Sequence, residues 1–262
     1  MLEYSLHSPS LYPPPLARRV LPLLGLGSLG VAAVMMQPIP AKLLVAAPEL
    51  QALPTLAQRA VLALNPLLLV IAACLVGGLC AHRAGLRSWL SGTATREGDQ
   101  VWINSIMLGL FMGATVWLLD ALWQPWLSNE WRTLISQPQP TDSWQRLTIG
   151  ILYGGIAEEI MARWGLMSLV LWILFHLSGL LARRWIVVCA ILLSALAFGG
   201  AHLPALAVQV DLDTNLVIRT LMLNGLGGVL YGWLFWRYHL ESAMVSHAAS
   251  HLILVACQLG NY

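Results

Sequence analysis

Long apolar runs alternate with short polar segments along the whole chain. A helix needs about 17–25 apolar residues to cross the ~30 Å hydrocarbon core of a bilayer. The runs lie near residues 20–36, 60–81, 101–123, 147–181, 185–203, 215–236 and 240–258. The pattern therefore predicts an all-α, polytopic membrane helix bundle of about seven transmembrane helices, with a range of six to eight.

The fourth run is longer than one crossing needs, because about 35 residues at ~1.5 Å each extend over roughly 52 Å. Such a helix could tilt and kink near Trp164–Gly165, extend into water, or break into two pieces. A break would move Arg183 and Arg184 to the side of the membrane that carries fewer basic residues. The loop charges therefore favour a single crossing.

Composition agrees with a membrane protein, because 58% of the 262 residues are hydrophobic and only 10% are charged. A soluble domain carries about 25% charged residues. The net charge of +2 comes from arginines that flank apolar runs, so we expect a lipid bilayer as partner and no nucleic acid. With seven crossings, basic residues are more numerous in the loops on the same side of the membrane as the N-terminus. This bias favours an integral, multi-pass protein with a cytoplasmic N-terminus, and we expect a prokaryotic cell (inner) membrane.

Two acidic residues, Glu158 and Glu159, lie deep within an apolar run, where an ionised group is costly. Glu159 and Arg163 are four residues apart and can pair on one face of a helix. Glu158 points about 100° away from Glu159 on an α-helix of 3.6 residues per turn, and it has no cation nearby in the sequence. We therefore expect Glu158 either to be protonated or to meet partners on other helices.

Histidines on two other runs are candidate partners. Phe198 and His202 are one helical turn apart near the end of the fifth run, and His247 and His251 are one turn apart in the seventh. A single histidine in a span usually serves packing, but three of them beside an unpaired glutamate indicate a shared site. His202 lies about 27 Å along its span and His247 about 10 Å, so they meet only if the helices are staggered, tilted or broken.

The chemistry that fits a carboxylate and histidines inside a membrane is hydrolysis by activated water. The carboxylate takes a proton from water, a histidine orients that water, and N–H donors stabilise the oxyanion. The sequence contains neither a GxSxG nor an HExxH motif. Covalent catalysis by a nucleophilic side chain is therefore disfavoured.

Three short motifs carry a resemblance to a known family. The sequence reads Glu158-Glu159-xxx-Arg163, then Phe198-xxx-His202, then His247-xxx-His251. These motifs resemble the EExxxR, FxxxH and HxxxN or HxxxD motifs of the CPBP family. That family comprises the CaaX protease and bacteriocin-processing (ABI) membrane enzymes and includes the Ras-converting CaaX endopeptidases. The resemblance covers about residues 147–258.

The resemblance implies a role for each matching residue. Glu158 would be the general base, and His202 would share the catalytic water with it. Glu159 and Arg163 would support the site structurally. His247 would bind the oxyanion or the substrate carbonyl.

His251 departs from the family pattern, which has Asn or Asp at that position. We expect it to act beside His247 at the oxyanion or substrate, and Phe198 to support the site. We favour glutamate-activated water with no cofactor, but the additional histidine leaves zinc open, because Glu and His side chains ligate zinc. The alternative zinc ligands are Glu158, His202, His247 and His251.

The resemblance also implies the domain organisation and the activity. Residues 147–262 would form a CPBP-like core with four helices, residues 20–146 a variable set of transmembrane helices with interfacial segments, and residues 1–19 a polar tail. The implied function is an intramembrane endopeptidase of glutamate type rather than a metalloprotease. It would hydrolyse a peptide bond of a membrane-embedded or membrane-proximal protein, in C-terminal processing or sorting.

Two other classes of function stay open. A proton-coupled carrier could use Glu158 and the histidines as a relay, although no inverted repeat is visible in the sequence. A non-catalytic CPBP-like scaffold or immunity protein could keep the fold without the reaction, because His251 departs from the family pattern.

Overall fold

The described part of the chain is a bundle of helices. The computed structural model describes residues 13–95, 98–137, 141–179 and 184–259, and the regular structure within them is entirely helical. Residues 1–12 of the predicted tail lie outside the described residues, as do residues 180–183, which include Arg183 and the end of the fourth run. The long helices are α1 Leu16–Val34, α4 Thr55–Cys80, α5 Asp99–Trp123, α9 Arg184–Ala201, α11 Thr214–Arg237 and α12 Leu240–Leu259.

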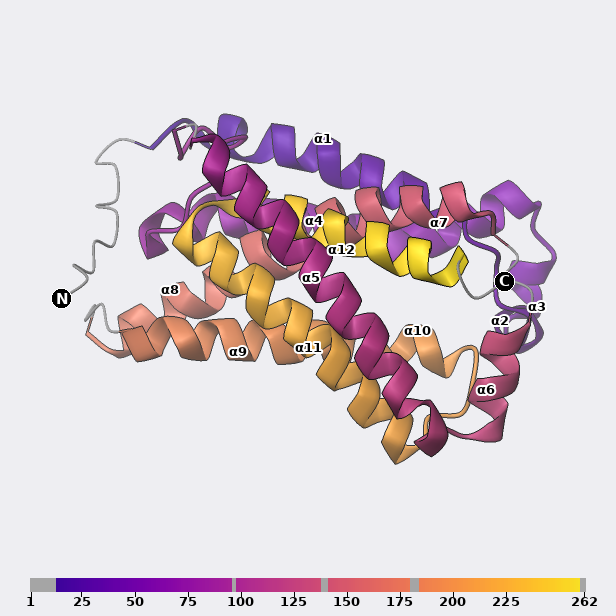
Figure 1. Cartoon of the computed structure of the whole chain (residues 1–262). Helices are drawn as coiled ribbons and strands as arrows, with labels where there is room; N and C mark the ends of the chain where they lie inside the picture. The colour runs from indigo at the N-terminus through magenta and orange to yellow at the C-terminus, as the bar shows by residue number, and fades with distance from the viewer. Residues whose placement is uncertain (1–12, 96–97, 138–140, 180–183, 260–262) are drawn as a thin grey trace.

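Short helices occupy the predicted interfacial segments and the helix junctions. The helices α2, α3 and α6 gather at the right end of the bundle in Figure 1, where α4 begins. The short helices are α2 Ala41–Ala46, α3 Pro48–Gln51, α6 Asn129–Ser136, α10 Leu203–Ala207, and the single turns η1 His82–Ala84 and η2 Gln124–Trp126.

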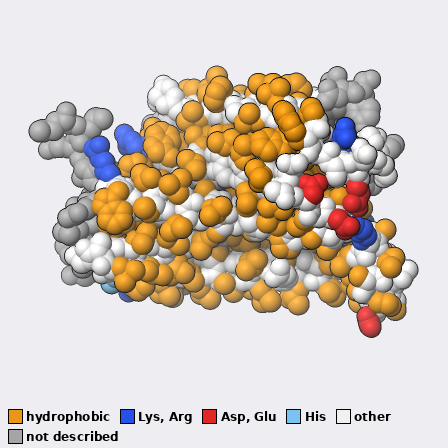
Figure 2. Space-filling view, turned by 90° about the horizontal axis from the view of Figure 1, so that it is seen from below, with side chains coloured by type: hydrophobic (Ala, Val, Ile, Leu, Met, Phe, Trp, Pro, Cys, Tyr) orange, Lys and Arg blue, Asp and Glu red, His pale blue; other side chains and the backbone are white. Residues whose placement is uncertain are grey.

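The bundle has the surface of a membrane protein. Six helices in the described residues are long and apolar enough to span a bilayer. Helix α11 is 24 residues long but more polar, and it packs against α9, α12 and α5 within the bundle. Helix α11 corresponds to the sixth of the seven predicted runs, and its crossing of the membrane stays a prediction. Hydrophobic side chains cover the middle of the face shown in Figure 2, and charged side chains gather toward its two ends.

The fourth apolar run forms one continuous helical path from Ser143 to Leu177, so it does not break into two pieces, and its single crossing stays a prediction. The path begins as α7 Ser143–Ile149 and ends as α8 Ser168–Leu177. Between them lie two π-helical segments, η3 Gly150–Glu158 and η4 Ile160–Met167. The irregularity expected near Trp164–Gly165 therefore takes the form of wider turns over a much longer stretch. Such turns are rare and are found frequently at functional sites.

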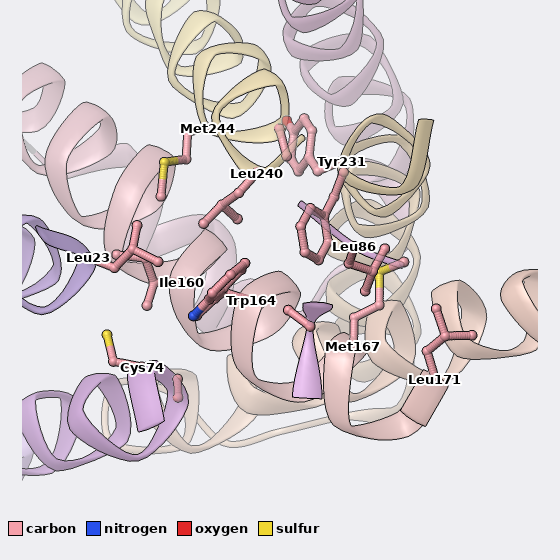
Figure 3. Close-up of a cluster of buried hydrophobic side chains, with 14 of the residues drawn as sticks. Leu23, Cys74, Leu86, Ile160, Trp164, Met167, Leu171, Tyr231, Leu240 and Met244 are labelled. Carbon is pink, nitrogen blue, oxygen red and sulfur yellow. The ribbon is translucent and has the colours of Figure 1, made fainter. Parts of the chain in front are cut away.

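The hydrophobic core surrounds the second π-helical segment. Ile160, Trp164 and Met167 are fully buried and meet side chains from α1, α4 and α11 (Figure 3). The Trp164 indole lies so close to Gly77 of α4 that a Cβ at residue 77 would collide with it. This packing holds Glu159 and Arg163 at a fixed depth, because both lie on the same turns as the core residues.

Helix α12, which carries His247 and His251, packs closely against α5. Gly109 and Gly113 of α5 face the backbone oxygens of Ser246 and Ser250, and a Cβ on either glycine would meet those oxygens. This Gly-xxx-Gly spacing is typical of close helix contacts in membranes. The contact fixes the position of α12 relative to the rest of the bundle.

The depth mismatch between His202 and His247 is resolved by stagger. Helix α9 begins well to the left of α12 in Figure 1, although both run toward the right end. Pro204 in the first turn of α10 cannot continue the hydrogen bonds of α9, so His202 lies at the junction of the two helices. His202, late in its span, and His247, early in its own, can therefore contribute to one region.

Candidate active site

Glu158 has its partner on another helix. Its Oε1 lies 3.8 Å from Nε2 of His202, and the two side chains are 16% and 32% exposed. His202 Nδ1 lies 2.8 Å from the backbone oxygen of Phe198, to which it can only donate. In neutral His202, Nε2 is therefore an acceptor that faces the carboxylate of Glu158. A separation of 3.8 Å is too long for a direct hydrogen bond.

Glu159 joins two buried basic groups. Its Oε2 lies 3.2 Å from Nε of Arg163, as the spacing of four residues predicts. Its Oε1 lies 2.8 Å from Nδ1 of His247 on α12. The Glu159 and Arg163 side chains are 0% and 1% exposed. Because water does not reach them, each charge is stabilised by the opposite charge of the other.

The Arg163 guanidinium lies over two aromatic rings. Its Cζ lies 4.6 Å from the centroid of the Phe198 ring and 5.5 Å from that of Tyr231. These contacts fall within the distance at which a cation is attracted to a ring face. The ion pair with Glu159 and the two rings together hold the guanidinium in place.

The ring of His247 stacks on two other rings. Its centroid lies 4.5 Å from that of Tyr231 and 5.1 Å from that of His251. The Tyr231 hydroxyl donates to Oγ of Ser250 over 2.8 Å, and that hydroxyl donates to the backbone oxygen of His247 over 2.7 Å. With Nδ1 facing Glu159, Nε2 of His247 is the nitrogen that can meet a substrate.

The position of His251 depends on two glycines. A Cβ at Gly150 would lie 2.7 Å from Cγ of His251, and one at Gly154 would lie 2.5 Å from its Nε2. Any larger residue at these positions of η3 would therefore displace the imidazole. His251, which departs from the family motif, therefore has room because of the glycines of η3, the π-helical segment that also carries Glu158.

The structure brings the three sequence motifs together in one region. The site has two halves, and Phe198 lies between them. Its ring centroid lies 4.8 Å from that of His202 and 6.1 Å from that of His247. One half is the Glu158–His202 pair. The other half contains the remaining predicted residues: Glu159, Arg163, His247 and His251.

The alternative set of zinc ligands does not converge. Among the described residues, no group of three or more His, Cys, Asp or Glu side chains is arranged to hold a metal ion. His247 directs Nδ1 to Glu159, and His202 directs Nδ1 to a backbone oxygen. These contacts leave Nε2 of each histidine free, but the four side chains are not gathered as zinc ligands in the described residues, so we derive no step through a metal.

The sequence does not predict the contacts of Tyr231 and Ser250, or the ion pair between Asp120 and Arg219. Tyr231 lies among apolar and glycine residues, where it reads as packing, and Asp120 reads as a group near the lipid headgroups. One signal was available for Ser250, which lies one turn after His247 on the same helix. The Asp120–Arg219 contact joins α5 to α11 and has no local sequence signal.

A comparison with protein families covers the region that contains the site. Residues 140–253 match the family described as Type II CAAX prenyl endopeptidase Rce1-like. This part of the chain is similar to the Rce1-like family. The Rce1-like match contains all three motifs and confirms the resemblance to the CPBP membrane proteases. Comparisons with curated proteins and with solved structures gave no match. The boundaries expected for the core, residues 147–262, stay a prediction.

Proposed function

We propose that this chain is an intramembrane endopeptidase that cleaves a membrane-associated protein with water activated by Glu158. The Rce1-like family supports the coarser statement, a CAAX-type membrane endopeptidase. The single observation that carries the mechanism is the Glu158–His202 pair, in which two acceptor atoms face each other 3.8 Å apart. A water molecule can donate one hydrogen to each acceptor, which leaves its lone pairs free to attack.

The proton transfers follow from this arrangement. Glu158 takes a proton from the water as its oxygen bonds to the scissile carbonyl carbon, and later gives that proton to the departing amine nitrogen. His202 orients the water through Nε2, and its Nδ1–H bond to Phe198 fixes the tautomer. One peptide bond breaks, and one water is consumed.

His247 is placed to stabilise the oxyanion of the tetrahedral intermediate through Nε2–H. Since Glu159 faces Nδ1, Nε2 carries a hydrogen in two cases. Either His247 is an imidazolium that donates from both nitrogens, or Glu159 is protonated and donates to Nδ1. Both arrangements leave Nε2–H of His247 available to an oxyanion. Glu159 and Arg163 then act as positioning residues for His247.

The proposal is tested in cells by comparing wild-type protein with the Glu158→Gln variant. Mass spectrometry of membrane peptides should show a substrate that accumulates in the variant and a C-terminal fragment that disappears. Glu130→Gln is the matched control, because Glu130 lies on α6 outside the site and should leave processing unchanged. Normal processing by Glu158→Gln would overturn the proposal. Normal processing after loss of all three motifs would instead support the scaffold alternative.

The cofactor and the membrane orientation are proposals of the same kind. We propose that the reaction uses no metal, which is tested by metal analysis of the purified active enzyme. Stoichiometric zinc whose removal abolishes cleavage would favour the metalloprotease alternative. We also propose a cytoplasmic N-terminus in a prokaryotic inner membrane, from the excess of basic residues on that side. Labelling of single cysteines in intact cells tests the orientation.

A further inference from the structure

A buried arginine lies where the start of α1 meets the end of α4, at the left end of the bundle in Figure 1. Arg19 is only 8% exposed. Its Nε donates to the backbone oxygen of Pro14 over 2.9 Å, and its Nη1 contacts the backbone oxygen of Gly78 and Nδ1 of His82. Nη2 makes no hydrogen bond within the part of the chain that the structure describes. The guanidinium is therefore held in place while its Nη2 hydrogens remain available to another acceptor.

Two exposed arginines flank Arg19. Neither Arg18 nor Arg83 forms an ion pair with an acidic residue in the described ranges. Arg83 lies close by, since burial, followed by the charges of Arg19 and Arg83, lowers the pKa of His82 to about 4. Arg18 packs on the loop between α4 and α5, where its Nε would lie 3.1 Å from a Cβ on Gly92. Three positive charges therefore gather at this end, and we call Arg18, Arg19 and Arg83 the arginine cluster.

The arginine cluster borders an apolar surface at the ends of two spans. Helices α1 and α4 cross closely there, because a Cβ at Gly78 would lie 2.9 Å from Val20 and 3.2 Å from Leu16. Leu16 and Leu79 are exposed at this crossing, and Trp89 is exposed on the following loop. Tryptophan is enriched at the level of the lipid headgroups. The surface thus changes from aliphatic to basic within a few residues, as a phospholipid changes from acyl chain to phosphate.

We propose that the arginine cluster binds the phosphate of one anionic phospholipid, whose acyl chains cover the exposed leucines beside it. Arginine N–H groups form strong, charge-assisted bonds with phosphate oxygens. A zwitterionic lipid carries a cation of its own next to the phosphate, so the cluster attracts it less. With the predicted cytoplasmic N-terminus, the cluster faces the leaflet whose surface is negative. The proposal goes beyond the endopeptidase function and does not depend on it.

The test compares two lipids with the same acyl chains, phosphatidylglycerol and phosphatidylcholine. Each is titrated into purified full-length protein in mild detergent at pH 7, and native mass spectrometry counts the bound lipids. The wild type should retain one phosphatidylglycerol with an affinity about 10-fold or more above that for phosphatidylcholine. Arg83→Gln and Arg18→Gln should each weaken phosphatidylglycerol binding about fivefold. Arg132→Gln is the matched control, because it removes one exposed arginine from α6 and should bind as the wild type does.

Three outcomes would overturn the proposal. Equal affinity for the two lipids would show that the cluster does not select negative charge. An equal loss of binding in Arg132→Gln would assign the preference to net charge rather than to this end of the bundle. Displacement of the lipid by an equal concentration of inorganic phosphate would show a site for free anions. Because Arg18 and Arg83 are exposed, their variants keep the proposal testable even if Arg19→Gln does not fold.

Discussion

Glu159 Oε1 lies 2.8 Å from His247 Nδ1, which connects the long fourth span to α12 across 88 residues of sequence. The neighbouring carboxylate, Glu158, instead faces His202 on α9. Two adjacent glutamates thus contact histidines on different helices. The wide turns of η3 and η4 carry both, and the one that is fully buried is the one that holds a histidine in place.

Removing the buried carboxylate should destabilise the fold. In Glu159→Ala, the guanidinium of Arg163 stays buried without its anion, which costs about 3–5 kcal/mol in free energy of unfolding. Thermal unfolding in a mild detergent measures this as a lower midpoint. Replacing Glu159 and Arg163 together with methionine should recover much of the loss. An unfolding midpoint of Glu159→Ala equal to that of the wild type would show that Glu159 does not stabilise the buried charge of Arg163.

Tyr231 should matter for its ring more than for its hydroxyl. Tyr231→Phe loses one hydrogen bond to Ser250, at a cost of about 1 kcal/mol, but keeps the ring stacked on His247. Tyr231→Leu leaves one face of His247 without its ring, and misplacement of a catalytic group can cost about 10²-fold in rate. We expect kcat to fall little in the first variant and strongly in the second. Equal kcat values for Tyr231→Phe and Tyr231→Leu would argue against a role for the Tyr231 ring in positioning His247.

Gly154 and His251 should be energetically coupled. In Gly154→Ala the new Cβ meets the imidazole at 2.5 Å, so His251 must shift and its stack with His247 is disturbed. In a His251→Ala background that Cβ has room. A double-mutant cycle on kcat/KM should therefore give a coupling of about 0.5–3 kcal/mol. Strictly additive effects would mean that the two residues act independently.

His82, which follows α4 outside the membrane spans, should make stability fall in acid. Burial, with help from Arg19 and Arg83, lowers its pKa from 6.5 to about 4. The folded state therefore holds fewer protons than the unfolded state between these values, and stability declines as the pH drops from about 6.5 toward 4. Its Nδ1 accepts a hydrogen bond from Arg19 over 2.8 Å, which protonation removes.

Unfolding midpoints measured across this range test the His82 prediction. His82→Gln keeps an acceptor for Arg19 without a titrating ring, so the variant should show a weaker decline in acid. An identical pH profile for both proteins would assign the decline to other groups.

The sequence predicted the helical architecture and which side chains gather at the site, but not all of the contacts between them. Apolar runs set the spans, and the spacing of Glu159 and Arg163 predicted their contact, because both are local properties of one helix. The partner of His247 was not predictable. It depends on the wide turns of η3 and on the approach of α12 to α5 at Gly109. Contacts between helices distant in sequence, such as Asp120 with Arg219, also lack a local pattern.

The central claim is that Glu158 activates water, and the most direct measurement is the kcat/KM of purified Glu158→Gln on a peptide substrate identified by the comparison in cells. The variant removes the acceptor charge next to His202 and leaves the Glu159–His247 and Glu159–Arg163 contacts in place. General base catalysis contributes about 10²- to 10⁴-fold, so kcat/KM should fall by that factor while the unfolding midpoint stays at the wild-type value. A folded Glu158→Gln enzyme that cleaves the peptide at the wild-type rate would contradict the account.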